Sequence, residues 1–496
     1  MKITRRSFLA TTTLAALAAP RGIAADVPAA FAQRGYYMLL NRTPLFGLEV
    51  WKDIVDGAAE DGANHLIVWI AGGFASKKFP ITWRYNAEHR NVRADFVAEL
   101  IRHAHTRGVR ILLGLTPFGY DGVNQFTIEH PELMATSADG RPTPRFGIHC
   151  WGWSLCPAKA ESQRLMLEYA RELIANFYPE ADGLFIESSD YSICHCAECG
   201  ARHFDHEFKF VRAISDEIWA RKPDATVVVY PHYFSGAKVT VDGGVQAAKQ
   251  PFDPRWTLFF TPHSAPPDAA LIRAARASWW WNDAPAFCNF RGVKAGAAQA
   301  RAAGFTGYMP TLECYNYLAT EAEDGHAWTK GRRQIPFGFG WLAEGASPYR
   351  ELPLRVMRVA CREWFADPAA PEEKVRAAVG RELFGEAATL QLIEDALALT
   401  RIFSTDRNWS TPPALTAPGL IAERKQRGQI NPAQLAQLRA QLATARDLAA
   451  RHTDATLLAA KQLATIARWL DAQWRGDNEV LLNDAPAASA EQPKSP

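Results

Sequence analysis

Short apolar segments alternate with longer amphipathic segments along most of the first 313 residues, and this alternation constrains the fold more than any other feature. The apolar segments are nearly continuous runs of aliphatic and aromatic residues, which is typical of strands in a parallel sheet covered on both faces. The amphipathic segments have the spacing of helices with one buried face. The predicted strands are 36–40, 65–70, 110–118, 183–187, 225–233, 256–263, 278–283 and 306–313.

Eight strand–helix units in about 310 residues predict an α/β fold, a (β/α)8 or TIM barrel. An open doubly wound sheet is the alternative, but no Gly-x-Gly-x-x-Gly turn follows the first strand. Two segments, SWWWN at 278–282 and AFCNF at 286–290, compete for the position of the seventh strand.

The composition changes near residue 351 to long helical segments rich in Ala, Leu, Gln and Arg. Asn431 is a predicted N-cap with Pro432 at the first helical position. A second helical segment follows at 457–474, so we expect a helical hairpin that packs on the barrel, on itself or across a homo-oligomer contact. The predicted organisation is a signal peptide at 1–32, a catalytic barrel at 33–349, an α-helical domain at 350–478 and a disordered tail at 479–496.

Paired arginines, Arg5 and Arg6, precede a short apolar run that ends near Ala19. This pattern is typical of a twin-arginine export signal, with an ordinary secretory signal as the alternative, and both predict a periplasmic or secreted protein. The apolar run of about a dozen residues is shorter than the ~20 residues of a spanning helix, so we expect no membrane anchor.

The overall charge disfavours two classes of partner. Fifty-five basic and 53 acidic residues give a formal charge of +2, so neither nucleic acid nor an anionic membrane is expected as a partner. Aromatic residues make up 11% of the chain and include 16 tryptophans, whose faces stack well on sugar rings, although a large core also uses tryptophan.

Active sites of (β/α)8 barrels lie at the C-terminal ends of the strands. Carboxylates and aromatic residues dominate those positions here, and the chain has no P-loop, Gly-x-Ser-x-Gly elbow or His-Glu-x-x-His motif. Opposed carboxylates in an aromatic mouth suit the cleavage of glycosidic bonds, in which one carboxyl group donates a proton and the other attacks or activates water.

Glu187 is the predicted general acid, because it ends an apolar strand whose surroundings favour the protonated carboxyl group. Asp283 and Glu313 are candidates for the second carboxylate. Asp190 is a further candidate, with capping of its own loop as the alternative role. Predicted sugar contacts come from Arg42, Tyr120, His232, Tyr233, His263, Trp281 and Tyr315.

A cluster of cysteines follows Glu187. Cys194, Cys196 and Cys199, together with the distant Cys156, have the ligand number of a closed, structural zinc site. Disulfides are the alternative in an oxidising compartment, and a catalytic metal with His195 or His203 is a third. Each arrangement pins the loop after Glu187. The remaining cysteines, predicted to be small buried side chains, include Cys288, Cys314 and Cys361.

The segment 154–200 resembles a segment of (β/α)8 glycoside hydrolase-like proteins related to α-glucuronidases and β-N-acetylhexosaminidases. The resemblance rests on Leu155-Cys156-Pro157, Asp182-Gly183, Glu187 and the Cys-x-Cys-x-x-Cys loop. The segments REWFADP at 362–368 and RELFG at 381–385 are similar to the helical C-terminal part of α-glucuronidase-type enzymes. In architecture the resemblance covers residues 34–480, but its specific motif is this one segment.

The chain also departs from those families. Hexosaminidases with substrate-assisted catalysis carry an adjacent Asp-Glu pair at the end of strand four, whereas Ser188 and Ser189 follow Glu187 here and Asp190 comes next. This puts the acetamido-assisted mechanism in doubt. Recognition of a sugar carboxylate, as in α-glucuronidases, would need a cation such as Arg42 or Arg84.

The resemblance and the strand-end residues together predict an exported glycoside hydrolase that takes carbohydrate substrates and requires no cofactor for catalysis. Two other functions stay open from the sequence. One is a metal-dependent hydrolase or lyase that uses the cysteine loop, and the other is a non-catalytic barrel that binds sugars.

Overall fold

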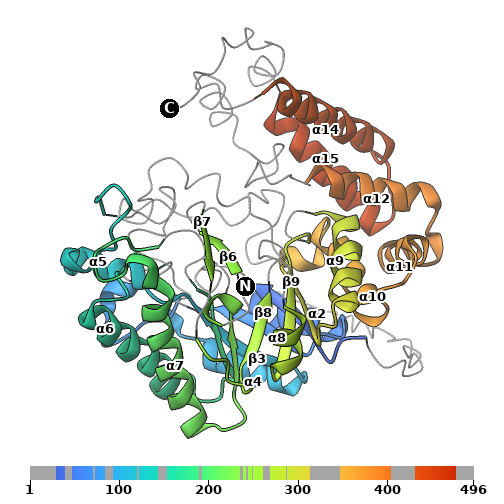
Figure 1. Ribbon diagram of the computed structural model, residues 1–496. Coiled ribbons are helices and arrows are strands. Elements are labelled where there is room, and N and C mark those ends of the chain that lie inside the picture. The colour runs from blue at the N-terminus through green and yellow to red at the C-terminus, as the bar shows by residue number, and fades with distance from the viewer. Residues whose placement is uncertain are drawn as a thin grey trace, which may run out of the picture.

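A computed structural model gives the structure of most of the barrel and of the C-terminal helices (Figure 1). It describes residues 30–38, 47–70, 73–83, 93–119, 122–142, 154–188, 193–234, 238–241, 244–247, 250–260, 268–285, 288–312, 347–403 and 431–475.

Parallel strands close into a barrel, as the sequence predicts, and the SWWWN segment is the seventh strand. Around the barrel the hydrogen-bonded order is β1-β10-β9-β8-β5-β4-β3-β2. The strands are β1 (Gln33–Met38), β2 (His65–Trp69), β3 (Arg110–Leu115), β4 (Gly183–Ile186), β5 (Thr226–Val229), β8 (Thr257–Phe260), β9 (Ala277–Asn282) and β10 (Gly307–Pro310).

Amphipathic helices surround the barrel (Figure 1), and each buries its apolar side. They are α2 (Leu48–Glu60), α4 (Val97–Thr106), α6 (Ala160–Arg171), α7 (His203–Arg221), α8 (Ala269–Ala274) and α9 (Phe290–Ala302), with α5 (Phe126–Glu129) in the insertion after β3. A π-helical segment at Glu172–Phe177 continues α6. An antiparallel pair that the sequence analysis did not predict, β6 (Lys238–Val241) and β7 (Gly244–Ala247), follows β5.

The remaining short elements are single 3-10 turns. They are η1 (Pro80–Thr82), η3 (Val123–Gln125), η4 (Pro131–Leu133), η6 (Gly200–Arg202), η7 (Pro231–Tyr233), η9 (Pro348–Arg350) and η10 (Gly385–Ala387).

Aromatic side chains fill the inside of the barrel. Phe259 of β8 lies 4.8 Å from Phe185 of β4 and 5.6 Å from Tyr37 of β1, measured between ring centroids. Neither β4 nor β1 is a neighbour of β8, so these contacts cross the interior. Deeper in the barrel, a Cβ atom on Gly307 would lie 2.2 Å from Trp279, so only glycine leaves room for that ring. The barrel is therefore a packed core, and a ligand must bind above it.

The C-terminal helices are α10 (Leu354–Ala366), α11 (Glu372–Phe384), α12 (Leu390–Ile402), α14 (Pro432–Arg451) and α15 (Leu458–Gln473). The predicted hairpin is present, since α14 and α15 pack along each other and on α12 (Figure 1). Asn431 is the N-cap of α14, and its side chain forms a capping box with Gln434.

Helix α10 joins this helical part to the barrel through a buried ion pair. Arg358 donates from Nε to Asp61 Oδ2 over 2.8 Å, and Tyr36 of β1 donates to the same oxygen over 2.8 Å. Burial raises the pKa of Asp61, while the Arg358 guanidinium opposes that rise. Each of these two buried charges has the other as its partner. Removing either Asp61 or Arg358 would therefore weaken the contact between the barrel and the C-terminal helices.

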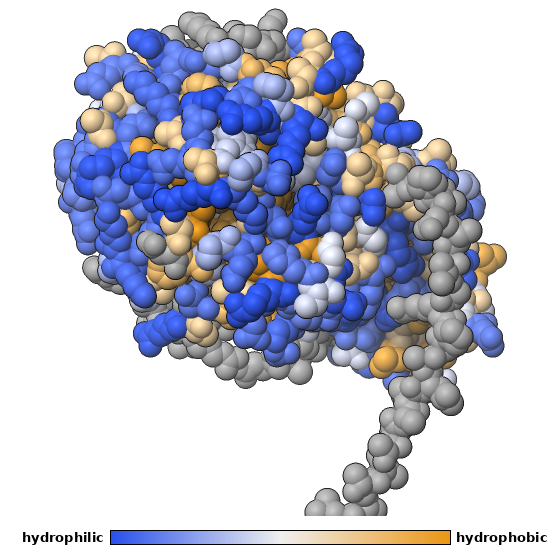
Figure 2. All heavy atoms as spheres, turned by 90° about the horizontal axis from the view of Figure 1, so that it is seen from below, coloured by the Kyte–Doolittle hydropathy of each residue, from blue (hydrophilic) through white to orange (hydrophobic). Residues whose placement is uncertain are grey.

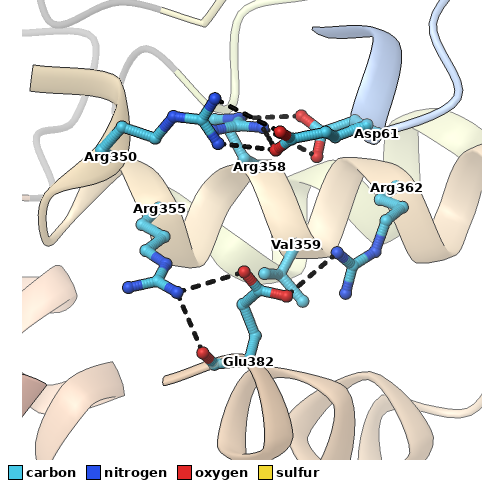
Figure 3. A pocket seen from close by; sticks show the side chains of 8 residues that line it. Asp61, Arg350, Arg355, Arg358, Val359, Arg362 and Glu382 are labelled. Carbon is cyan, nitrogen blue, oxygen red and sulfur yellow. Dashed lines mark hydrogen bonds and ion pairs between the residues drawn. The ribbon is translucent and has the colours of Figure 1, made fainter. Parts of the chain in front are cut away.

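Further charged residues surround this ion pair in a pocket between α2 and α10 (Figure 3). Arg350 bonds to Asp53 and Glu60, while Arg355 and Arg362 both bond to Glu382. Asp61 follows α2 and precedes β2, so the pocket lies at the N-terminal end of the barrel, away from the end where barrel active sites lie. We therefore assign it a structural role.

The surface seen from below the view of Figure 1 is mostly hydrophilic, and hydrophobic residues show mainly in a central hollow (Figure 2). Among the described residues, the large hydrophobic side chains that are exposed are Ile128, Leu390 and Leu458. None of the helices in the described ranges has the length and apolar character needed to span a membrane. The homo-oligomer stays a prediction.

Candidate active site

Glu187 stands directly after β4 at the C-terminal end of the barrel, which we call the mouth. Its backbone N–H donates to Leu115 O over 3.0 Å, so the strand ladder still holds it. Side chains alternate along a strand, which places Glu187 on the inner side with Phe185. Tyr37 of β1 donates to Glu187 Oε2 over 2.9 Å, and Glu187 is only 6% exposed. The carboxylate is thus held above the aromatic core at the place that the sequence predicts.

The sequence analysis did not identify Tyr37, although a signal for it was present. Tyr36 and Tyr37 are neighbours in a strand, so one must point outward and the other inward. Tyr36 bonds to Asp61 outside the barrel, and Tyr37 bonds to Glu187 inside it. The alternation of side chains could have predicted that one tyrosine points into the barrel and the other outward. It could not predict the residues to which they bond.

The floor beneath Glu187 consists of aromatic rings. Tyr37 lies 5.1 Å from Phe185, 5.6 Å from Phe259 and 6.1 Å from Trp281 between ring centroids. Trp281 donates from its indole nitrogen to Thr311 Oγ1 and is 8% exposed. Trp281 therefore belongs to the layer next to the mouth, and its predicted contact with a sugar stays a prediction.

The other two tryptophans of β9 are not at the mouth. Trp279 lies against His65 lower in the barrel, at 5.1 Å between ring centroids. Trp280 lies on the opposite side of the strand, 5.2 Å from Phe305. Both rings are buried, so neither is placed to stack on a sugar.

Asp283 follows β9 and is partly exposed. The preceding turn is rigid, since Asn282 accepts from the Ala284 N–H over 2.9 Å and donates to Tyr308 over 2.6 Å. In the barrel order, β5 and β8 separate β9 from β4. Glu187 and Asp283 therefore stand at the ends of strands that are not neighbours in the barrel.

His232 and Tyr233, predicted to contact the sugar, are buried in η7 after β5. Ser188 bonds to His232 Nδ1, and Tyr233 donates to Glu207 Oε2 over 2.9 Å. Burial lowers the pKa of His232 to about 4. Burial and the Glu207 carboxylate hold the pKa of Tyr233 well above its ordinary range. Buried partners thus hold both side chains in the wall of the site, and their predicted contact with a sugar stays a prediction.

Glu207 of α7 is a fully buried carboxylate that the sequence analysis missed. Besides Tyr233, it has His203 Nε2 within 3.6 Å of its Oε1 atom. His203 in turn accepts from the backbone N–H of Cys194 over 3.0 Å at its Nδ1 atom. These contacts form a continuous path from Tyr233 below the mouth to the cysteine loop.

The structure brings the predicted cysteines together, with all four sulfur atoms within 4.8 Å of one another. Cys156 lies 3.7 Å from Cys196 and 3.6 Å from Cys199, measured between sulfur atoms. A disulfide has an S–S distance of about 2.05 Å, so the cluster is not a pair of disulfides in this structure. Cys288 and Cys361 are buried apart from it, as predicted.

Several predicted site residues lie outside the described residues, and their roles stay predictions. They are Arg42, Arg84, Tyr120, Asp190, His263, Glu313, Cys314 and Tyr315.

Neither a protein-family model nor a curated protein matches the chain. Among solved structures it is similar to a chitobiase from Flavobacterium johnsoniae, with 11% identity over 91% of this chain and 75% of that chain and a TM-score of 0.41. It is also similar to a mutant O-GlcNAc hydrolase from Thermobaculum terrenum, with 11% identity over 91% of this chain and 83% of that chain and a TM-score of 0.46. A third similar structure is dispersin B, with 10% identity over 60% of this chain and 96% of that chain and a TM-score of 0.38. Similarities at this level do not assign an activity to this chain.

Proposed function

We propose that the chain is an exported glycoside hydrolase that cleaves O-glycosidic bonds in oligo- or polysaccharides, with Glu187 as general acid. The observation that carries this proposal is the position of Glu187. Its carboxylate lies at the mouth of the barrel, 6% exposed and bonded to Tyr37 from the opposite wall. A carboxyl group held in one orientation this way is positioned to meet a glycosidic oxygen.

The second carboxylate would come from Asp283 or Glu313. Asp283 is partly exposed at the end of β9, where a substrate at the mouth could reach it. The separation of the two carboxyl groups decides the stereochemistry, at about 5.5 Å for retention and ~6.5–9.5 Å for inversion. Proton NMR of the anomer that the reaction releases first would distinguish retention from inversion.

The sugar would bind above the aromatic floor that contains Trp281. Because side chains fill the barrel below this level, the substrate would lie across the mouth rather than enter the barrel. The proposed chemistry needs proton transfer and nucleophilic attack only, so it requires no cofactor. Export rests on the paired arginines Arg5 and Arg6 at the N-terminus.

A metal-dependent hydrolase or lyase that uses the cysteine loop is less well supported. Four thiolates complete a tetrahedral coordination shell, and no position then remains for substrate or water. The cluster is also largely buried, with Cys156 and Cys194 at 0% exposed. This geometry favours a structural role for the cysteines and leaves the chemistry to the carboxylates.

The test is hydrolysis of a panel of aryl glycosides and of plant and algal oligosaccharides by the wild type, Glu187→Gln and Glu198→Gln. Glu198 is an exposed carboxylate on the loop after β4, so its variant is the matched control. We expect turnover to fall by about 100-fold or more in Glu187→Gln with the fold intact, and to be unchanged in Glu198→Gln.

The other outcomes are equally informative. Turnover that survives Glu187→Gln removes this residue from the mechanism. Sugar binding without turnover, in the wild type as in the variant, identifies a non-catalytic sugar-binding barrel instead.

A further inference from the structure

The four clustered sulfur atoms come from two loops beside the barrel mouth. Cys156 stands in the turn before α6, whereas Cys194, Cys196 and Cys199 lie in the loop between β4 and α7. Their sulfur atoms all lie within 4.8 Å of one another. Residues more than 35 positions apart in sequence, such as Cys156 and Cys194, meet here because of the fold, not because of a local turn.

The spacing of the sulfur atoms matches the shell of one metal ion. A Zn–S bond of about 2.3 Å in a tetrahedron places neighbouring sulfur atoms about 3.8 Å apart. The observed distances from Cys156 are 3.7 Å to Cys196 and 3.6 Å to Cys199. These two distances match two edges of such a tetrahedron, and every other pair of sulfur atoms lies within 4.8 Å.

The backbone provides hydrogen bonds for negatively charged sulfur. The N–H of Thr136 donates to Cys194 Sγ over 3.4 Å, and the N–H of Cys199 donates to Cys196 Sγ over 3.4 Å. Such donors orient metal-bound thiolates and stabilise their charge. This arrangement is independent of the sulfur spacing and points to the same ligand.

The cysteine cluster is also buried. Cys156, Cys194 and Cys199 are at most 1% exposed and pack with Ala135 and Ala158. A bound cation would compensate the charge of four thiolates, which such a buried site could not otherwise hold. We propose that Cys156, Cys194, Cys196 and Cys199 bind one Zn²⁺ in a closed structural site.

The zinc ion would fix the loop that follows Glu187. The backbone around the cluster is tied to the insertion after β3, since Cys156 N donates to Leu133 O over 2.8 Å and His195 N donates to Thr136 O over 2.7 Å. The backbone N–H of Cys194 also donates to His203 Nδ1 on α7 over 3.0 Å. One ion would therefore join the insertion after β3, the turn before α6 and the start of α7, all on the same side of the mouth.

The experiment uses the full chain, purified without chelators, and elemental analysis by mass spectrometry. We expect one zinc per chain. Titration of the wild type with a mercurial thiol reagent should release that zinc, seen with a colorimetric zinc indicator. Since neither measurement involves a sugar, the result does not depend on the proposed hydrolase activity.

Two variants locate the metal. Cys196→Ser changes the only half-buried member of the cluster among residues that the structure describes, so it disturbs the packing least. We expect it to lower zinc affinity by at least about tenfold. Cys361→Ala removes a buried cysteine far from the cluster and should keep the full zinc content.

The wild type alone also tests the role of the ion, in case the variant does not fold. A strong chelator should lower the midpoint of thermal unfolding by several degrees, and added Zn²⁺ should restore it. Two disulfides in the mass of the purified chain, iron in place of zinc, or equal zinc affinity in Cys196→Ser and Cys361→Ala would overturn the proposal.

Discussion

Tyr36 and Tyr37 are adjacent in β1 but bond to carboxylates on opposite sides of the barrel wall. Tyr36 donates to Asp61 in the joint with the C-terminal helices, and Tyr37 donates to Glu187 at the mouth. Each phenol stabilises the ionised form of its carboxylate partner. Replacing the two residues in turn therefore separates the stability of the fold from the chemistry of the site.

The first prediction concerns Tyr37→Phe. Loss of a hydrogen bond to a charged group costs about 1.5–3 kcal/mol, so the protonated form of Glu187 becomes easier to populate. We expect the limb of the pH–activity profile that reports Glu187 to move to higher pH by about one unit or more. A shift of the alkaline limb identifies Glu187 as the acid, whereas a shift of the acid limb identifies it as the base or nucleophile.

Tyr36→Phe is the matched control for this measurement. It removes the same hydroxyl group from the neighbouring residue, so it should lower the midpoint of thermal unfolding and leave both limbs in place. Equal pH profiles for Tyr37→Phe and the wild type would show that the bond to Glu187 has no part in the reaction.

The second prediction is a loss of stability in acid caused by His232. Burial lowers its pKa from the ordinary 6.5 to about 4. Between these values the unfolded chain binds a proton that the folded chain does not, so the free energy of unfolding decreases as the pH falls from about 6.5 to 4. The loss at the lower end is about 3 kcal/mol for this one histidine. Burial lowers the pKa of His65 to about 4 as well, which adds to the effect.

Thermal unfolding midpoints of His232→Asn, measured from pH 7 to pH 4.5, test this prediction. Asparagine places an amide group near the Nδ1 position that bonds to Ser188 but does not titrate. The variant should lose part of the acid sensitivity, whereas His105→Asn, at an exposed histidine, should keep it. The same acid sensitivity in both variants would contradict a role for His232.

At the scale of whole elements, the buried pair of Arg358 and Asp61 is an ionic contact between α10 and the barrel. Arg358→Met leaves Asp61 buried without its main partner, and breaking a buried pair from one side costs about 3–5 kcal/mol. The third prediction is therefore a large decrease in the midpoint of urea unfolding. Arg376→Met is the control, because the side chains of Arg376 and its partner Glu394 are 30% and 44% exposed, and pairs near the surface contribute about 0–1 kcal/mol.

The double variant Asp61→Asn with Arg358→Met sharpens this test. Removing both charges should restore part of the stability lost in Arg358→Met, since no unpaired charge then remains. If Arg358→Met and Arg376→Met lower the midpoint equally, the buried pair does not hold the joint.

The barrel could be predicted because continuous apolar runs already identify buried parallel strands. The pair β6 and β7 was missed, although Asp242-Gly243 between two alternating segments is a strong hairpin signal. The π-helical continuation of α6 has no such signal, since its sequence reads as ordinary helix. Regular elements follow from local patterns, whereas departures from regularity depend on packing that the sequence does not display.

The same distinction holds for the site. Glu187 could be located because it ends a predicted strand. Its bond to Tyr37 could not be predicted, because the two residues are 150 positions apart. They meet only when the barrel closes in the observed register. Glu207 looked like one more charge on an amphipathic helix until the structure placed Tyr233 against it. The cysteines were recognisable because their spacing alone suggests ligands.

On the scale of the whole molecule, helix α10 of the C-terminal part belongs to the barrel's outer layer. Phe365 of α10 lies 5.6 Å from Tyr36 and 5.9 Å from Tyr308, measured between ring centroids. Trp364 lies 5.2 Å from Phe290 of α9. The helices α14 and α15 instead pack on each other and on α12.

The fourth prediction follows from this difference. A chain that ends at residue 346 loses α10 and exposes this part of the core, so we expect it to be insoluble or to unfold far below the full chain. A chain that ends at residue 430 keeps α10 to α12 and should remain folded. Soluble yield and thermal unfolding of both truncated chains provide the measurement, and a stable, soluble shorter chain would contradict the prediction.

The joint between Asp61 and Arg358 also has a consequence for how the protein is made. The two residues are 297 positions apart, so Asp61 leaves the ribosome long before its partner. At ~5–20 residues per second, the delay is roughly 15 to 60 seconds. Throughout that interval the first strand and helix of the barrel hold a carboxylate that cannot be buried at low cost. We therefore expect the barrel to complete its fold only after the helix at 354–366 has been synthesised, late in the translation of the 496-residue chain.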